Sequence, residues 1–171
     1  ADFVKQLRGA FALAIYNEGE KKLYLFRDAL GLRPLFYTMK AGALIFASEI
    51  KGLFPYPGIE AVLDQEGLTE LISLGPARKP GSAIFKGIFE VKPGHYMTFH
   101  REGLKDHVFH SFQIKEHTDN YEDTLDHISY LLDQSISGLK GSVMPISSLL
   151  SGGLDSSIVT AKLAKDSDSA L

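Results

Sequence analysis

Several features are missing from this sequence of 171 residues, and each absence excludes a class of protein. The chain contains no cysteine, which excludes a disulfide framework, a cysteine-ligated zinc site and a cysteine nucleophile within these residues. No apolar run approaches the ~20 residues that a membrane-spanning helix needs, so no membrane partner is expected. A basic excess is also missing, because 18 Lys and Arg stand against 21 Asp and Glu. A nucleic-acid partner is therefore not expected.

The first residues lack both an apolar leader segment and an initiator methionine, which are expected at the start of a secreted precursor or of a complete chain. We therefore expect the sequence to begin inside a longer chain. Because it stops shortly after a glycine-rich loop at residues 151–157, we expect it to end inside one as well. Hydrophobic residues make up 44% of the sequence, which is enough for a packed core.

Residues 1–114 are predicted to form a β-rich region with short turns. In residues 9–17, the bulky Phe11, Leu13 and Ile15 alternate with alanine, which is the period of a strand. A polar turn separates them from a second apolar run, so the two runs predict a hairpin. Further strands are expected near residues 35–38, 44–47, 88–91, 96–99 and 108–112.

Helices are predicted at four places. A short one should follow Ser48, and Asp64 is a plausible cap for one over residues 64–74. After a polar linker near Lys115, apolar residues recur at three- and four-residue spacing over 125–139, which indicates an amphipathic helix. A buried strand is then expected over residues 143–150, followed by the loop and a last helix over 158–165. Residues 115–171 thus resemble the start of an α/β unit.

The loop Ser151-Gly152-Gly153-Leu154-Asp155-Ser156-Ser157 carries the strongest functional signal. Two adjacent glycines allow a sharp turn and a close approach to a phosphate. The helix that follows directs free N–H groups and its positive dipole end at that anion. The hydroxyl groups of the three serines are additional donors.

Asp155 is consistent with a phosphate site only if a cation bridges the carboxylate and the phosphates, so the pattern predicts Mg²⁺ held in part by Asp155. No lysine follows the glycines, and the loop is therefore not the common GxxxxGK[ST] motif. It resembles the pyrophosphate-binding loop of the PP-loop ATP pyrophosphatases, which implies ATP as a substrate. By this resemblance the nucleotide site would include Leu150, Ser151, Gly152, Gly153, Asp155, Ser156 and Ser157.

The first half of the chain indicates which family of PP-loop enzymes the sequence resembles. Residues 27–37, Arg-Asp-Ala-Leu-Gly-Leu-Arg-Pro-Leu-Phe-Tyr, and residues 46–53, Phe-Ala-Ser-Glu-Ile-Lys-Gly-Leu, resemble segments of glutamine-hydrolysing asparagine synthetases. Residues 9–15 and 91–95 are similar to two weaker motifs of the same family. The resemblance implies the C-terminal part of an αββα glutaminase sandwich over 1–114. Over 115–171 it implies the first helix-strand-loop-helix unit of a PP-loop α/β domain.

The family resemblance implies ATP-dependent amidation of aspartate to asparagine with ammonia from glutamine, through β-aspartyl-AMP and with release of AMP and pyrophosphate. It implies a cytoplasmic enzyme, with a homodimer as one expected assembly of the full-length protein. The family's glutaminase nucleophile is a cysteine, and none lies in these residues. We therefore place no catalytic residue here and expect the chain alone to be inactive.

Three residues fall in segments that lie near the interdomain ammonia tunnel in the family: Ala10, Gly31 and Leu32. Apolar walls suit a tunnel, because they neither protonate nor trap ammonia, but plain core packing explains these residues equally well. For the neighbouring Arg27 and Asp28, a buried, hydrogen-bonded anchor for the loop is the favoured interpretation, with a catalytic role as the alternative.

The sequence departs from the family directly before the loop. Relatives usually show Asp-Val-Pro-x-Gly there, whereas residues 142–148 read Ser-Val-Met-Pro-Ile-Ser-Ser. Two alternative functions stay open. One is another PP-loop amidotransferase, such as a β-lactam-synthetase-like enzyme, and the other is a non-catalytic nucleotide-binding fragment.

Overall fold

The computed structural model of this chain describes residues 2–138 and 146–165. It divides into two compact units, Ala1–Gln113 and Ile114–Leu171, which are treated separately below. Within the described residues, no helix combines the length and the apolar character needed to cross a membrane.

The first unit contains two antiparallel sheets. One has the strand order β1-β2-β6-β7 and the other the order β4-β3-β5. The strands of the first sheet are β1 (Ala12–Asn17), β2 (Lys22–Arg27), β6 (His95–His100) and β7 (Gly103–Val108), and those of the second are β3 (Phe36–Lys40), β4 (Ala43–Ala47) and β5 (Ile88–Glu90).

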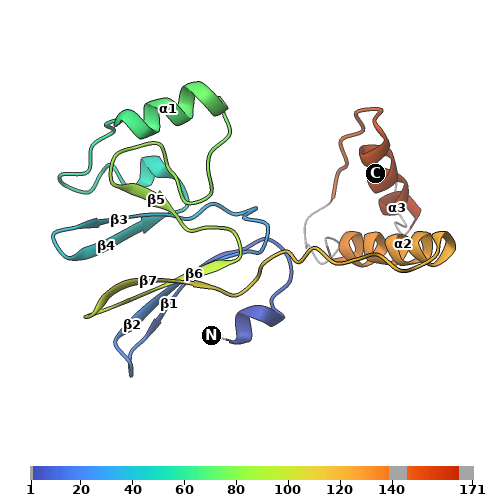
Figure 1. Ribbon diagram of the computed structural model, residues 1–171, viewed down its shortest axis with the longest axis horizontal. Helices are drawn as coiled ribbons and strands as arrows, with labels where there is room; N and C mark the ends of the chain where they lie inside the picture. Colours follow the sequence, from blue (N-terminus) through green and yellow to red (C-terminus); the bar gives the residue numbers. More distant parts are fainter. Residues whose placement is uncertain (1, 139–145, 166–171) are drawn as a thin grey trace. The chain divides into compact units, whose positions relative to one another are not determined.

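The helical elements of this unit are η1 (Asp2–Gln6), η2 (Ile50–Gly52) and α1 (Gln65–Leu74). The two sheets lie one above the other, and α1 lies on the side of the second sheet that faces away from the first (Figure 1). Leu25 and Met97 of the first sheet form a buried cluster with Leu35 and Val91, which joins the sheets. A second cluster around Phe36, Leu53, Ala83 and Ile88 lies on the other face of the second sheet.

The predicted hairpins are present. Strands β1 and β2 pair with Ala12 opposite Arg27, and β3 and β4 pair with Phe36 opposite Ala47. The last predicted strand of this unit is wrong. A strand was expected over residues 108–112, whereas the observed strand β7 covers Gly103–Val108 and ends where the predicted one was to begin. Its polar residues belong to an edge strand, where solvent on one side allows them.

Helix α1 begins as predicted, because the Asp64 side chain accepts a hydrogen bond from the Gly67 N–H at 2.9 Å. Its apolar side chains Leu68, Leu71 and Ile72 are exposed, whereas Gly67 and Glu70 are buried. The helix expected after Ser48 is only the single turn η2. Helix α1 therefore contacts the rest of its unit through a small residue and a carboxylate.

The second unit contains α2 (Tyr121–Ser137) and α3 (Leu154–Lys165). Helix α2 is capped by Asn120, whose side chain accepts a hydrogen bond from Asp123 N–H at 2.9 Å. The predicted strand is wrong over residues 146–150, which have no regular structure, and its first part lies outside the described residues. A buried strand requires neighbouring strands for its backbone hydrogen bonds, and the described part of this unit supplies none.

Candidate functional site

The serine–glycine loop, residues 151–157, merges directly into a helix. Helix α3 begins at Leu154, four residues before the predicted start at Ile158, so Asp155 lies in its first turn. The first N–H groups of a helix have no partner within the helix, and here they follow directly on two glycines. Gly152 has φ +85, and a Cβ built on it would have no atom within 4 Å. The backbone is thus open to a ligand at this point.

Hydroxyl groups hold the loop in shape. The Ser151 and Ser156 hydroxyl oxygens lie 2.9 Å apart, and the Ser157 hydroxyl donates to the Gly153 carbonyl at 2.7 Å. All of these groups are in exposed positions. Such bonds are easily exchanged for bonds to ligand oxygens, because each neutral hydrogen bond contributes only about 1 kcal/mol.

Helix α3 is attached to the rest of its unit by polar contacts. The Lys162 ammonium pairs with the Asp133 carboxylate of α2 and donates to the Ser129 hydroxyl at 3.4 Å. The Ser148 and Thr160 hydroxyl oxygens lie 2.6 Å apart, which ties the segment before the loop to the same helix. These contacts tie the middle and the last turn of α3 to α2 and to the segment before the loop.

Six of the predicted nucleotide-site residues lie at one helix start: Ser151, Gly152 and Gly153 directly precede α3, and Asp155, Ser156 and Ser157 belong to its first turn. Leu150 directly precedes Ser151 and is 62% exposed. Within the described residues, no group of three or more His, Cys, Asp or Glu side chains could hold a metal ion. A magnesium ion bound at Asp155 would therefore take further ligands from phosphate oxygens, as Mg²⁺ commonly does.

A second loop, residues 28–33 (the Asp28 loop), forms around a buried carboxylate. Asp28 is 1% exposed and accepts hydrogen bonds from four backbone N–H groups, at 2.9–3.3 Å. Burial alone raises the pKa of this carboxyl. The N–H groups of Arg33, Leu32, Phe11 and Leu30 outweigh that effect, and they hold the pKa below its usual value of 3.8.

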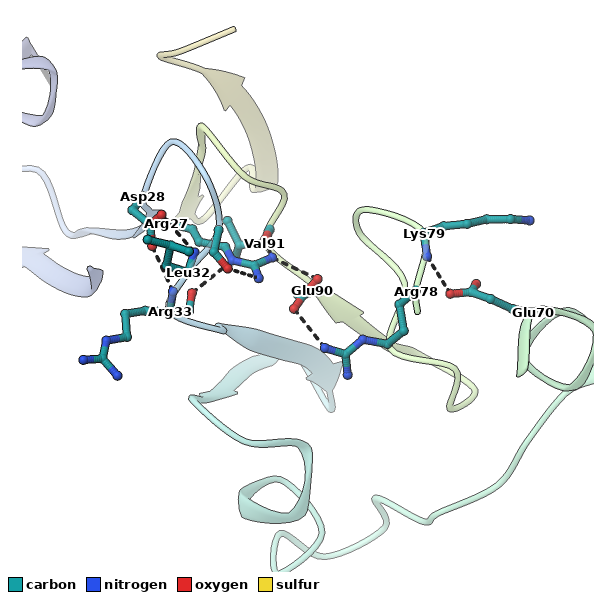
Figure 2. A network of polar contacts seen from close by, with 10 residues as sticks. Arg27, Asp28, Leu32, Arg33, Glu70, Arg78, Lys79, Glu90 and Val91 are labelled. Atoms are coloured by element: carbon teal, nitrogen blue, oxygen red, sulfur yellow. Dashed lines mark hydrogen bonds and ion pairs between the residues drawn. The ribbon is translucent and has the colours of Figure 1, made fainter. Parts of the chain in front are cut away.

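Arg27 supports the Asp28 loop from the other side. Its guanidinium donates to the carbonyl groups of Arg33 at 3.0 Å, Val91 at 2.8 Å and Gly31 at 2.8 Å, as Figure 2 shows in part. Gly31 has φ +68, and a Cβ there would lie 2.7 Å from Pro93 Cγ. The prediction of a buried, hydrogen-bonded anchor at Arg27 and Asp28 is thus confirmed.

The three residues assigned to a tunnel lie in, or next to, segments that bond to this anchor. Gly31 and Leu32 are part of the Asp28 loop, and Leu32 is 62% exposed. Ala10 precedes Phe11, whose N–H and C=O both bond to Asp28. The structure thus gathers the three residues in one neighbourhood, and their role as tunnel lining stays a prediction.

Sequence reasoning missed Glu90, a carboxylate that is 6% exposed and pairs with Arg27 at 2.9 Å. The alternation of buried and exposed positions along strand β5 could have identified Glu90 as buried. Ile88 and Glu90 have the same parity and are both buried, whereas Phe89 between them is exposed. A charged residue at a buried strand position requires a partner, and that partner lies 63 residues away in the sequence.

Two family models match this chain. Residues 1–110 match the family described as glutamine amidotransferase domain, and residues 127–171 match the family described as asparagine synthase. Asparagine synthetase [glutamine-hydrolyzing] 3 of Bacillus subtilis is 41% identical over 160 residues, which cover 94% of this chain and 26% of that protein.

More distant relatives include two proteins that are each 30% identical. Asparagine synthetase [glutamine-hydrolyzing] 2 of Bacillus subtilis is matched over 97% of this chain and 24% of its own length. Amidase chry2 of Gibberella zeae is matched over 95% of this chain and 24% of its own length. A solved structure of glutamine phosphoribosylpyrophosphate amidotransferase from B. subtilis aligns with 95% of this chain and 32% of its own chain. The TM-score is 0.41 and the sequence identity is 19%, so this similarity carries no conclusion about fold or function.

The chain spans about a quarter of the length of the curated relatives that it matches. The glutamine amidotransferase match covers well over half of the chain, and the asparagine synthase match follows it along the sequence. The chain therefore belongs to the glutamine-hydrolysing asparagine synthetase family.

Proposed function

We propose that the full-length protein containing this chain makes asparagine from aspartate, with ATP and with ammonia released from glutamine. The observation that carries the proposal is the exposed serine–glycine loop at the start of α3, in a chain of this family. In the proposed reaction, an aspartate carboxylate oxygen attacks the α-phosphate of ATP, and pyrophosphate leaves. Ammonia then attacks the β-aspartyl-AMP carbonyl and displaces AMP.

The proposed role of this chain's own residues is to hold the diphosphate that leaves. N–H groups at Gly152, Gly153 and the first turn of α3 would donate to its oxygens. The Ser151, Ser156 and Ser157 hydroxyls would exchange their present partners for the same oxygens. Asp155 would bind Mg²⁺, which neutralises phosphate charge when bound. Leu150 would border the nucleotide.

We further propose that residues 1–114 are the C-terminal part of an αββα glutaminase sandwich and that residues 115–171 begin a PP-loop domain. The two face-to-face sheets support the first assignment, and the loop at the start of α3 supports the second. A cytoplasmic location and a homodimer are proposed on family grounds alone.

The test is direct. The full-length protein, given Mg²⁺, ATP, aspartate and either glutamine or ammonium, should form AMP, pyrophosphate and asparagine in equal amounts. Formation of ADP and phosphate, or no turnover with any nitrogen donor, would contradict the proposal. The isolated 171-residue chain should form no asparagine under the same conditions.

A second function is an amide-forming reaction with a different acceptor. It is favoured by one observation, namely that Amidase chry2 is as similar to this chain, at 30% identity, as one of the asparagine synthetases. Pyrophosphate release that requires some other carboxylate, and that aspartate does not stimulate, would select this alternative.

The proposed tunnel has its own test. Replacing Leu32 by tryptophan in the full-length protein would narrow an apolar passage at that point. We expect more glutamine to be hydrolysed for each asparagine formed, whereas synthesis from added ammonium should not change. Unchanged coupling would remove Leu32 from the passage, and with it the argument for Ala10 and Gly31.

A further inference from the structure

A buried carboxylate connects two segments that lie far apart in the sequence. The Glu90 Oε2 atom lies 2.9 Å from the Arg27 guanidinium, and the Glu90 Oε1 atom lies 3.5 Å from Arg78 Nη2. Arg27 belongs to the anchor of the Asp28 loop. Arg78 belongs to residues 75–81, called here the Arg78 turn. Figure 2 shows Glu90 between the two arginines.

The contact on the Arg27 side is tight and buried. Arg27 and Glu90 are each 6% exposed, and the same Arg27 nitrogen that faces Glu90 also donates to the Val91 carbonyl. A buried guanidinium that loses its counter-ion is costly, because no solvent replaces the missing charge. Any displacement of the Glu90 carboxylate therefore acts on Arg27, and through it on the carbonyl groups of Gly31 and Arg33.

The contact on the Arg78 side is looser. Glu90 Oε1 accepts no hydrogen bond from the described part of the chain, so its interaction with Arg78 is a charge interaction across 3.5 Å. The Arg78 guanidinium also lies over the Phe36 ring, 5.1 Å from its centre, and its side chain is 36% exposed. Arg78 is thus held by two attractions and is still accessible from solvent.

The Arg78 turn has a second, independent attachment. Glu70 of α1 accepts a hydrogen bond from the Lys79 N–H at 2.8 Å. Burial alone raises the pKa of the Glu70 carboxyl, but bonds from Lys79 N–H and Ser82, with the charges of Lys79 and Arg78, outweigh it and hold the pKa below its usual value. Since Glu70 holds the backbone of the turn in place, Arg78 can be removed without releasing the turn itself.

We propose that Arg78 and Glu90 are positioning residues, which transmit the position of the Arg78 turn through Arg27 to residues 31–33 of the Asp28 loop. For its catalytic consequence the inference rests on the proposed function, in which this loop borders the path of ammonia. A shift of the Arg78 turn would then change how much glutamine-derived ammonia reaches the synthetase reaction.

The experiment compares Arg78→Ala with Lys79→Ala. Both substitutions remove one positive charge from the same turn, but the Lys79 side chain points away from Glu90 (Figure 2), and its backbone bond to Glu70 does not depend on the side chain. The first measurement is amide hydrogen exchange of the 171-residue chain at Leu32 and Arg33. Arg78→Ala should speed exchange there by about two- to thirtyfold, the usual range for residues in a coupled network, and Lys79→Ala should not.

The second measurement uses the full-length protein and counts glutamine consumed per asparagine formed. Arg78→Ala should raise this ratio by about twofold or more, whereas synthesis from added ammonium and the ratio in Lys79→Ala should stay unchanged. The inference is wrong if Arg78→Ala alters neither exchange nor ratio, or if Lys79→Ala has the same effects. If the unsubstituted protein makes no asparagine even from ammonium, the proposed function fails, and amide exchange alone still decides on the positioning role.

Discussion

The Asp28 loop and the serine–glycine loop both turn on a glycine at positive φ, but opposite chemistry holds them in place. In the first, a buried carboxylate and a buried guanidinium bind the backbone groups of the loop. In the second, exposed hydroxyl groups bond to one another and to a carbonyl. Buried charges fix one shape, because losing them costs far more than losing neutral bonds. Exposed hydroxyls leave a loop free to exchange its partners for a ligand, so the first loop is suited to support and the second to binding.

The comparison is tested most strongly at Asp155, which has a proposed role in binding but no hydrogen-bonded role in the loop itself. Asp155→Asn in the full-length protein should lower the rate of pyrophosphate formation about a hundredfold or more, with little effect on folding. The matched control is Asp126→Asn on α2, which should have no effect on the rate. Equal rates in both variants would mean that the loop does not bind the reacting phosphates in the proposed way.

Asp28→Asn provides the opposite test, because it should impair stability first. In the unsubstituted chain four backbone N–H groups donate to the two carboxylate oxygens of Asp28. The asparagine side chain would replace one of these acceptors by an NH₂ donor, so the free energy of unfolding should fall by about 3 kcal/mol. Urea unfolding of the 171-residue chain would measure this change. Glu18→Gln, on an exposed turn, should change it little, and an equal loss in both variants would refute the anchor role.

The two glycines allow a matched comparison of the loops. Gly31→Ala combines a strained φ with a Cβ 2.7 Å from Pro93 Cγ, so it should cost about 2 kcal/mol of unfolding free energy. Gly152→Ala meets no atom within 4 Å, and its cost should be about 1 kcal/mol, from backbone strain alone. Thermal unfolding of both variants would show the order, and a larger loss for Gly152→Ala would reverse the comparison.

The smallest expected effect is on pH dependence. The pKa of Asp28 is lower in the folded chain than its usual value of 3.8, so its stabilising contribution is present above that value and is lost as the pH falls through the folded pKa. Between about pH 4 and pH 3, the unsubstituted chain should lose up to about 1 kcal/mol more than Asp28→Asn does. If the free energy of unfolding changes with pH in the same way in both proteins, the Asp28 carboxyl has the same pKa in the folded and the unfolded chain, and the expected effect is absent.

The parts of the fold predicted correctly depend on local signals. The alternation of Phe11, Leu13 and Ile15 indicated a strand, and Asp64 indicated the start of a helix, because caps and alternation act over a few residues. The strand expected before the serine–glycine loop failed over residues 146–150, since a strand depends on neighbours that a local pattern does not contain. The start of α3 was placed four residues late, because Asp155 and its serines were read as loop.

The candidate site was predictable to a similar extent. The motif at residues 151–157 named residues that the structure places directly before α3 and in its first turn, although their role is still a proposal. Arg27 and Asp28 were expected as an anchor, because a charged pair directly after a strand requires partners. The link from Glu90 to Arg78 was not predicted, since nothing local shows which distant cation a buried carboxylate meets.

The two units also differ in how much apolar surface they bury. The first contains two buried apolar clusters, whereas Ile136 and Leu163 are the buried apolar residues among those described in the second. Calorimetry of the whole chain should therefore show two heat-absorption peaks, because each unit melts according to its own packing. A single melting temperature would then be an average of two events, and it would not report the stability of the second unit, which carries the proposed nucleotide site.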